Sequence, residues 1–542
     1  MDHRASSLTT TRDSAMLCAD PSETQFRRQE KVYVLYPKAD CALALKGYNG
    51  ASMVDLQSSL LSASQPFSFV LFGASGHLAQ LKIYPALYIL AEKGRLPDDY
   101  ALVGFARSPM TDDEFRGMVE QSIRKDLIEP NEKKLAAFLE RVHYHQGNYD
   151  EEDDFAALAK KLRGLEKGWK NPVRLAYYSV PPSVFGAISE NLCKGGVHEE
   201  GIPLRNIVEK PVGGDLKSFE LIKKQLSSCF SDEEIYLLDH YLGKEAVRNV
   251  FYLRYANPVL ERLFKNTLIE YVEITAAEPG GIEQRAGYFE HTGTFRDMFQ
   301  SHLMMAMALL TMRVQHDADG FRESRANALS QLYLPPATDM DDIVLQGQYA
   351  AGTVNGKSVP GYREEQDVDP QSRTNTFAAL RLMTRISRWE GVPFYLRSGK
   401  RLQKKETRIS IQFQVPHAVG EGSTPNRLHV ILQGEAGMRF ELQTKLGGTE
   451  PVFRPLVLSD PLICFGDCLP EHGMLLLEAI HGRKQWFLSF EEVQMSWRLL
   501  DPVQSHLSKD TTALHEYPAG SMGPEAIHEW IGRDGRSWQE IA

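Results

Sequence analysis

The stretch Phe67–Leu78 reads FSFVLFGASGHL, an apolar run that ends in a turn containing two glycines. Aromatic and β-branched residues predict a strand over Phe67–Phe72, and the apolar spacing after Leu78 predicts a helix. A strand, a glycine turn and a helix in this order direct backbone N–H groups at a phosphate. We therefore expect a dinucleotide to contact the turn residues Gly73, Ala74, Ser75, Gly76, His77 and Leu78. The spacing is GxxG rather than GxGxxG, so an ordinary strand-to-helix turn is the alternative interpretation.

The residue that follows the second predicted strand, residues 101–105, indicates which dinucleotide binds. Enzymes that use NAD usually place an acidic side chain there, which binds the ribose 2′-hydroxyl. This chain has Arg107 near that strand end, and a guanidinium group can bind a 2′-phosphate through two N–H donors. A solvent-facing strand-end residue is the alternative for Arg107. The glycine turn and Arg107 together predict NADP as the cofactor.

Strands and helices alternate from residue 66 to about residue 240. We predict helices at residues 112–124 and 131–139 and further strands at residues 174–180, 206–209 and 235–240. An alternation of this kind predicts a parallel, doubly wound sheet, which is an α/β dinucleotide-binding (Rossmann-like) domain.

The pattern changes after Gly243. Long helices are predicted at residues 244–255 and 295–312, and alternating strands at residues 408–415, 428–433 and 438–444. Such strands are typical of a larger α+β domain with a mostly antiparallel sheet. We divide the chain into a partly disordered N-terminal extension (1–65), the Rossmann-like domain (66–240) and the α+β domain (241–542).

Composition excludes several classes of protein. The chain has 542 residues and a formal net charge of −10, which argues against a nucleic-acid partner because such binding needs a basic surface. Apolar runs such as Met304–Leu310 are too short to span a bilayer, so we expect no membrane association. Residues 4–12 are rich in Ser and Thr and contain two arginines, as a transit peptide would be, but Asp2, Asp13 and Asp20 argue against one, so targeting is the lesser alternative.

The cysteines predict neither disulfides nor a metal site. There are six of them, at Cys18, Cys41, Cys193, Cys229, Cys464 and Cys468. No pair has the CxxC spacing of a zinc site, and none lies among clustered histidines. We expect free thiols in a reducing, cytoplasmic environment.

The segment Asp239–Glu245 reads DHYLGKE and follows an apolar strand. Side chains alternate along a strand, so Asp239 and His240 should face opposite ways and serve different partners. His240, Tyr241 and Lys244 offer hydrogen-bond donors near a helix start, which predicts a phosphate site. A structural role is the alternative for the first three residues of this segment.

The segment DHYLGKE strongly resembles the signature of the glucose-6-phosphate dehydrogenase family. Matching segments occur in the family's order from about Phe67 to the C-terminus: FGASGHLAQLKIYPAL, VGFARS, VEKPVGGDL, EPGGIEQRAGYFEHTGTFRDMFQSHL, GVPFYLRSGKRLQKK and MSWRLLDPV. The resemblance implies oxidation of glucose 6-phosphate at C1 with hydride transfer to NADP, in a cytoplasmic homodimer or homotetramer. A catalytically silent NADP-binding subunit and a dehydrogenase of another hexose 6-phosphate are the alternatives.

The resemblance also assigns site residues. It implies that His302 is the catalytic base and that Asp239 is its partner, and the apolar helix around His302 independently predicts a buried histidine that needs a partner. The implied substrate ligands are Lys210, His240, Tyr241, Lys244, Glu278, Asp297, Lys400 and Lys405, with Gln433 as a weaker candidate. Lys210 is also implied to contact the cofactor. Asp297 precedes His302 by five residues, so on an α-helix the two should not share one face.

Two positions depart from the family pattern. The family usually has aspartate where this chain has His77, and a histidine there could bind the cofactor phosphates more strongly at low pH. Animal members hold a second, structural NADP with basic residues that align with Glu406, Ser410 and Ile431. None of these three side chains can bind a phosphate through a guanidinium fork, so we expect the second NADP site to be absent or much altered.

Overall fold

The computed structural model describes residues 65–127, 129–283, 285–315, 317–415, 424–464 and 468–539. All of them belong to one compact unit, Leu61–Ala542. The predicted N-terminal extension lies outside the described residues, apart from Gln65. Among the described residues, no helix combines the length and the apolar character needed to cross a membrane.

The first sheet is parallel and has six strands in the order β3-β2-β1-β4-β5-β6. This is a doubly wound order, as the alternation of strands and helices predicts. Its strands are β1 (Phe67–Phe72), β2 (Tyr100–Ala106), β3 (Val142–Gln146), β4 (Val173–Tyr178), β5 (Leu204–Glu209) and β6 (Ile235–Leu238). Every residue of β1, β2 and β4 is buried, because helices cover both faces of a parallel sheet.

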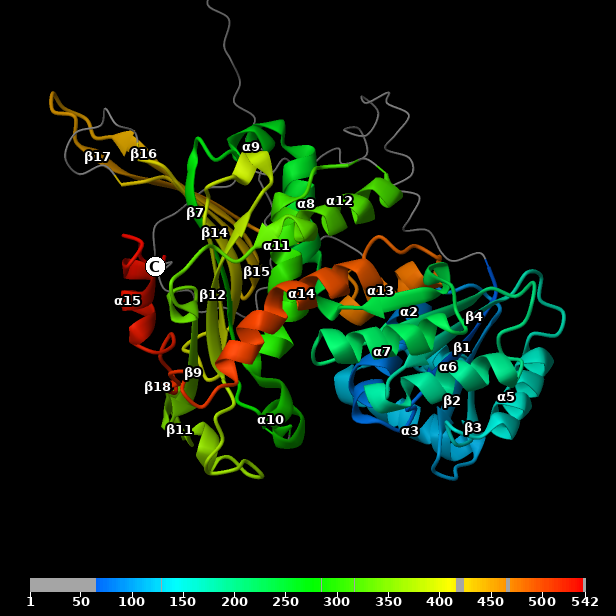
Figure 1. Ribbon diagram of the computed structural model, residues 1–542. Helices are drawn as coiled ribbons and strands as arrows, with labels where there is room; N and C mark the ends of the chain where they lie inside the picture. The colour runs from blue at the N-terminus through cyan, green and yellow to red at the C-terminus, as the bar shows by residue number, and fades with distance from the viewer. Residues whose placement is uncertain are drawn as a thin grey trace, which may run out of the picture. The chain divides into compact units, whose positions relative to one another are not determined.

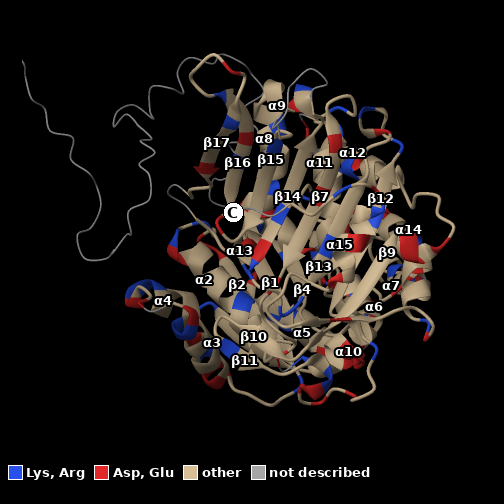
Figure 2. Ribbon diagram, turned by 90° about the vertical axis from the view of Figure 1, so that its left-hand side faces the viewer, with Lys and Arg blue, Asp and Glu red and all other residues tan. Residues whose placement is uncertain are grey.

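Helices connect these strands (Figure 1). They are the π-helix η3 (Ala79–Ile83), α2 (Tyr84–Glu92), α3 (Asp112–Asp126), α4 (Glu132–Leu139), α5 (Glu152–Leu165), α6 (Phe185–Lys194) and α7 (Leu216–Ser227). Thr111 and Glu114 form a capping box that begins α3. Pro85 is the second residue of α2, but η3 runs directly into α2, so its missing N–H group falls inside a continuous helical run. The colouring of the ribbon in Figure 2 shows acidic and basic residues interspersed along α3 and α4.

The second sheet has ten strands, of which nine follow the order β17-β16-β15-β14-β7-β13-β12-β9-β18, and β8 pairs with β12. Its pairs are antiparallel except β13 with β7 and β18 with β9. The strands are β7 (Ile269–Ala277), β8 (Leu332–Tyr333), β9 (Val344–Ala350), β12 (Phe377–Thr384), β13 (Phe394–Gly399), β14 (Glu406–Phe413), β15 (Arg427–Gln433), β16 (Gly437–Lys445), β17 (Phe453–Pro461) and β18 (His515–Pro518). Strands β10 (Gly352–Val354) and β11 (Lys357–Val359) form a separate hairpin. The mostly antiparallel sheet predicted from the sequence is confirmed.

Helices cover both faces of the ten-stranded sheet (Figures 1 and 2). On β7, Val272 and Ile274 belong to the core that includes α11 (Met304–Thr311), whereas Tyr271 packs with the cluster that includes α15 (Ala526–Gly532). This alternation follows from the two-residue period of a strand. The remaining helices are α8 (Glu245–Ala256), α9 (Pro258–Leu263), α10 (Ala286–Thr294), the π-helix η7 (Phe295–Leu303), α12 (Ala318–Ser330), α13 (Glu471–Ile480) and α14 (Phe490–Leu507).

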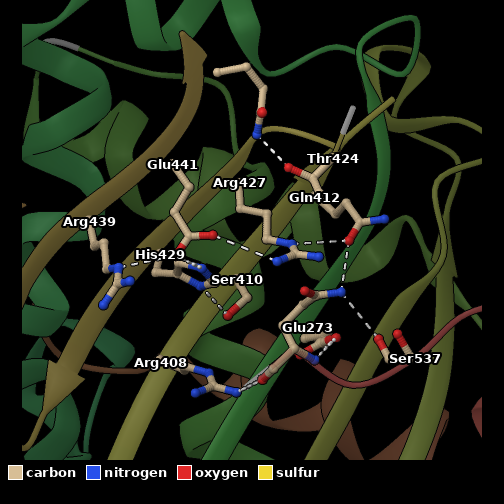
Figure 3. A network of polar contacts seen from close by, with 12 residues as sticks. Glu273, Arg408, Ser410, Gln412, Thr424, Arg427, His429, Arg439, Glu441 and Ser537 are labelled. Carbon is tan, nitrogen blue, oxygen red and sulfur yellow. Dashed lines mark hydrogen bonds and ion pairs between the residues drawn. The ribbon is translucent and has the colours of Figure 1, made fainter. Parts of the chain in front are cut away.

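A polar network lies on β7, β14, β15 and β16 of this sheet (Figure 3). Glu273 accepts a hydrogen bond of 2.8 Å from the backbone N–H of Gln539, and Arg408 donates to the carbonyl of Gln539. Burial raises the pKa of Glu273 to about 7. Ser410 bonds His429, whose pKa is lowered to about 3 by burial and by nearby arginines. The C-terminal segment therefore supplies partners to charged groups that the sheet buries.

The structure corrects the expectation of free thiols for four cysteines. Cys193 and Cys229 form a disulfide with a Cα–Cα distance of 6.4 Å, and Cys464 and Cys468 form another with 5.9 Å. Cys193 and Cys229 are 36 residues apart in sequence, so only the packing of α6 against α7 brings them together. The other two cysteines lie outside the described residues.

Candidate active site

The glycine turn lies where the chain leaves β1, beside the loop that follows β4. Gly73 has a φ of +79°, and a Cβ atom there would lie 2.2 Å from the carbonyl oxygen of Ser179, so no larger residue fits. The N–H of Gly76 donates to the carbonyl of Gly73 at 2.8 Å. The strand order reverses between β1 and β4, and ligands of doubly wound sheets bind at this kind of switch point.

The other predicted cofactor residues surround this turn. Leu78 precedes the first residue of η3, and His77 is exposed. Arg107 is exposed one residue beyond the end of β2. A close backbone turn, a helix start and an unburied guanidinium group on neighbouring strands fit a dinucleotide with a 2′-phosphate.

The segment after β6 differs from the prediction. The strand ends at Leu238, and His240–Gly243 form the 3-10 helix η6. Asp239 caps this helix by accepting a hydrogen bond of 3.0 Å from the N–H of Tyr241. Asp239 and His240 therefore diverge because a helix begins there, and the predicted strand alternation is the wrong reason for their separate partners.

His302 lies in the π-helix η7, which also corrects a prediction. Lys210 Nζ lies 2.6 Å from Nε2 of His302 and 3.5 Å from Oδ1 of Asp297, so these two side chains reach the same group. Bonding from residue i to i+5 in a π-helix places positions 297 and 302 above one another. The α-helical rotation expected from the sequence does not apply, and Asp297 does lie in the first turn of the helix.

The contacts of His302 define its tautomer. Its Nδ1 lies 2.8 Å from Oδ1 of Asp239. Lys210 can only donate a hydrogen bond, so Nε2 of His302 must accept it, and Nδ1 therefore carries the proton that is donated to Asp239. The ring of Tyr241 stacks on the imidazole with a centroid distance of 3.7 Å. The arrangement holds a neutral imidazole whose Nε2 lone pair is directed at the substrate side.

Electrostatics support this charge state. Burial lowers the pKa of His302, and Lys210 lowers it too, although Asp239 opposes both effects. Burial alone would raise the pKa of Asp239, but His302 and Lys210 hold it well below its usual range. At neutral pH the pair is a carboxylate beside a neutral imidazole, which is the state that a general base requires.

The predicted phosphate ligands converge around Tyr241. Lys244 Nζ lies 3.8 Å from the centroid of the Tyr241 ring and 3.4 Å from Oε1 of Gln433. Burial lowers the pKa of Lys244, and Lys405 lowers it further. Burial also lowers the pKa of His240. Lys405 itself is exposed, so the solvated-surface alternative for this residue stays open.

The predicted ligands Lys400 and Glu278 form an ion pair. Lys400 Nζ donates to Oε2 of Glu278 at 2.7 Å, and the lysine is 5% exposed. Burial would raise the pKa of Glu278, but Lys400 lowers it. The structure thus brings together all of the predicted substrate ligands except Lys405. The charge of Lys405 acts on the site only by lowering the pKa of Lys244.

A cavity of about 370 Å³ opens beside the catalytic pair. Its lining includes Lys210, Asp297, Tyr288 and Trp497. The Lys210–Pro211 peptide bond at its edge is cis. Neither His302 nor Asp239 lines this cavity, and its link to them is Lys210, whose Nζ lies 2.6 Å from Nε2 of His302.

Sequence reasoning missed a second polar group next to this site. His472 is the second residue of α13, and its Nε2 lies 3.5 Å from Oε1 of Glu209, which also accepts a 2.5 Å hydrogen bond from Tyr177. The His472 ring is parallel to that of His240 at 6.2 Å. Glu209 precedes Lys210 and could have been found for that reason, but nothing local in the sequence connects His472 to Glu209, which lies 263 residues earlier in the chain.

Comparisons with known proteins identify the family. Residues 70–249 match the family model "Glucose-6-phosphate dehydrogenase, NAD binding domain", and residues 251–539 match "Glucose-6-phosphate dehydrogenase, C-terminal domain". The chain belongs to the glucose-6-phosphate dehydrogenase family. The two matched regions cover both sheets, apart from the first three residues of β1, and every described residue of the candidate active site.

Curated relatives of this glucose-6-phosphate dehydrogenase family member span bacteria, fungi and plants. The glucose-6-phosphate 1-dehydrogenase of Chlamydia pneumoniae is 36% identical over 498 residues, which is 88% of this chain and 96% of the relative. That of Schizosaccharomyces pombe is 35% identical over 487 residues, covering 89% and 96%. A solved glucose-6-phosphate dehydrogenase in complex with glucose-6-phosphate is 30% identical, with a TM-score of 0.80, and covers 88% of this chain and 99% of that chain.

Proposed function

We propose that this chain is an NADP-dependent glucose-6-phosphate dehydrogenase. It oxidises glucose 6-phosphate at C1 to 6-phospho-D-glucono-1,5-lactone, the first step of the oxidative pentose phosphate pathway. The observation that carries the proposal is the placement of His302, whose Nδ1 lies 2.8 Å from Asp239 and whose Nε2 lies 2.6 Å from Lys210. The curated relatives named glucose-6-phosphate 1-dehydrogenase support the same activity.

The reaction removes one proton and one hydride from the sugar. His302 Nε2 accepts the proton of the C1 hydroxyl, and Asp239 stabilises the imidazolium that forms. For this the C1 hydroxyl replaces Lys210 as the donor to Nε2, which leaves the ammonium free for the sugar or the cofactor. NADP, when bound at the glycine turn, supplies the acceptor for the hydride from C1.

The remaining ligands position the sugar. The phosphate is bound by His240, Tyr241, Lys244, Lys400 and Lys405, whose cationic and hydroxyl groups suit a dianion. Glu278 and Asp297 accept hydrogen bonds from sugar hydroxyls. The ion pairs that these carboxylates make with Lys400 and Lys210 support this assignment, because the same lysines then orient both ends of the substrate.

The activity is tested with the purified full chain. We expect absorbance of reduced nicotinamide to rise when glucose 6-phosphate and NADP are added, and the rate to be lower with the C2 and C4 epimers of the sugar. An equal rate with an epimer would favour another hexose 6-phosphate as the substrate. No signal with NADP or NAD would favour the catalytically silent subunit.

The choice of NADP is tested with Arg107→Ala. The variant removes the guanidinium beside the end of β2, and charge-assisted hydrogen bonds contribute about 1.5–3 kcal/mol each. We expect kcat/KM for NADP to fall by about 10- to 100-fold and kcat/KM for NAD to change little. The exposed Arg124→Ala on α3 is the matched control. An equal loss with both cofactors would contradict the role of Arg107.

We also propose a homodimer or homotetramer joined through the ten-stranded sheet. Strand β17 is the edge strand of that sheet among the described residues, and Leu456, Val457 and Leu458 are exposed on it. An exposed apolar edge strand favours association with another chain. A second copy of this chain is the partner that we propose, because edges related by symmetry can cover each other.

The association is tested by light scattering coupled to gel filtration. We expect wild type to have the mass of two or four chains and Leu456→Lys with Leu458→Lys to shift toward one. The control is Val259→Lys on α9, where the valine is also exposed. A monomeric wild type, or a double variant of unchanged mass, would refute this interface.

Domain boundaries at residues 65 and 240 remain our proposal. The two family models meet near residue 250, and β6 ends at Leu238, which supports a change of domain in this region. We propose a cytoplasmic location, which the family resemblance implies; the relative from Solanum tuberosum is named chloroplastic.

A further inference from the structure

A cluster of sulfur and imidazole groups lies between α6 and α7, apart from the active site. Cys193 is near the end of α6, and Cys229 is two residues beyond the end of α7. His198 lies in the segment after α6. All three residues are partly exposed, and their ligand atoms lie within 4.8 Å of one another. The cluster therefore joins three segments and remains open to solvent.

The distance between sulfur and nitrogen in this cluster is that of two ligands on one ion. Cys193 Sγ lies 3.5 Å from Nδ1 of His198. Zinc binds thiolate sulfur at about 2.3 Å and imidazole nitrogen at about 2.0–2.1 Å in tetrahedral geometry. Two such ligands are separated by about 3.5 Å. His198 and Cys193 thus already have the spacing that a tetrahedral cation sets.

A carboxylate fixes the imidazole in the tautomer that a metal requires. Nε2 of His198 lies 2.8 Å from Oε1 of Glu234. The other oxygen of Glu234 accepts hydrogen bonds from the N–H and hydroxyl of Ser231 at 2.9 and 2.8 Å, so the carboxylate is itself held in place. Because Nε2–H donates to Glu234, the lone pair of Nδ1 faces the sulfurs. Histidines that bind metals usually donate their other N–H group in this way.

We propose that Cys193, Cys229 and Nδ1 of His198 bind a thiophilic divalent cation of the Zn²⁺ type when the two cysteines are reduced. Two thiolates and one imidazole are a ligand set of zinc sites, and the exposed side of the cluster leaves the fourth position to water. Glu234 is the positioning residue of His198. Another His-containing acidic group, Asp339, Asp341 and His506, has no sulfur ligand and two exposed carboxylates.

The disulfide and the metal are alternative states of the same residues. Reduction by a dithiol breaks the S–S bond, transfers two hydrogens to the cysteine sulfurs and closes the dithiol to a disulfide. The cation then displaces one proton from each thiol and binds two thiolates. Two thiolates on zinc lie about 3.8 Å apart, so the bond between the sulfurs must be broken first. The oxidised chain therefore cannot hold the cation at this place.

The proposal is tested by zinc binding to the full chain. The protein is reduced with dithiothreitol, freed of it by anaerobic gel filtration, and titrated with Zn²⁺ against a chromophoric chelator. Two variants distinguish the contributions of the cysteines to zinc binding. In the first, Cys193 and Cys229 are replaced by serine. In the second, serine replaces the other four cysteines, Cys18, Cys41, Cys464 and Cys468. We expect the first variant to lose one equivalent of zinc relative to reduced wild type, and the second to keep that equivalent.

Further measurements distinguish a specific zinc site from adventitious binding of zinc to thiols. Glu234→Gln should weaken zinc binding by about 10- to 100-fold with both cysteines in place. Co²⁺ in the second variant should give the sulfur-to-cobalt absorption of a tetrahedral thiolate site. Equal zinc binding by oxidised and reduced protein, or by the Cys193 and Cys229 variant and wild type, would overturn the proposal. Dehydrogenase activity in the same samples reports on the proposed function independently.

Discussion

His302→Asn is expected to lower kcat by at least about 10²-fold and up to about 10⁴-fold, the contribution of a positioned general base. Asparagine can still occupy the space beside Asp239, but it has no group that accepts a proton at neutral pH. The phosphate ligands around Tyr241 and Lys244 are untouched, so KM for glucose 6-phosphate should change little. Steady-state kinetics with NADP and substrate binding by calorimetry measure the two effects separately.

The control is His429→Asn, which replaces another buried histidine that has a hydrogen-bond partner. It lies in the polar network of β14 and β15, and we expect it to keep kcat within about threefold while its Tm reports any loss of packing. Full activity in His302→Asn would remove the base assignment. A raised KM with unchanged kcat would instead indicate that His302 only binds the sugar.

Much of the fold follows from local patterns. The run Phe67–Phe72 is buried along its whole length because both faces of a parallel sheet are covered, and its near-continuous apolar character is the reason that the sequence predicts it. Residues 408–415 alternate between polar and apolar side chains. This alternation predicts a strand because successive side chains of a strand point to opposite faces of the sheet. Strand ends shift by one or two residues, as at Leu238, because capping by Asp239 competes with strand extension.

The candidate site is less completely predictable from the sequence, and the contacts that the sequence did not predict share a cause. His302 and Asp297 were found, but their relative placement depends on a π-helix that no periodicity signals. His472 meets Glu209, and Cys193 meets Cys229, only through helix packing between segments far apart in the chain. The spacing of a motif indicates contacts only within one segment of the chain. A search for CxxC spacing therefore cannot detect cysteines that two separate helices bring together.

The acid limb of kcat/KM is expected to reflect His302. Burial and Lys210 lower the pKa of this imidazole below its usual 6.5, so its neutral, proton-accepting form persists at neutral pH. Activity should therefore stay constant down to a pH below 6.5 and then fall about tenfold per unit as the ring is protonated. Asp239 does not produce this limb, because its pKa lies far below the range. His240 and Asp297 also face the site, and burial lowers the pKa of His240 as well.

Asp239→Asn separates these contributions and is expected to have an effect comparable in size to that of His302→Asn. The carboxylate raises the pKa of His302, so its removal should move the acid limb to lower pH. The substitution should also lower the plateau of kcat/KM by about 10³- to 10⁴-fold. The asparagine amide can donate a hydrogen bond to Nδ1, which favours the tautomer with the proton on Nε2, and Nε2 then cannot accept the proton of the C1 hydroxyl. The pH profiles of kcat/KM for wild type and variant measure both changes. A limb that moves to higher pH, or a variant with the wild-type plateau, would mean that Asp239 does not act through the imidazole of His302.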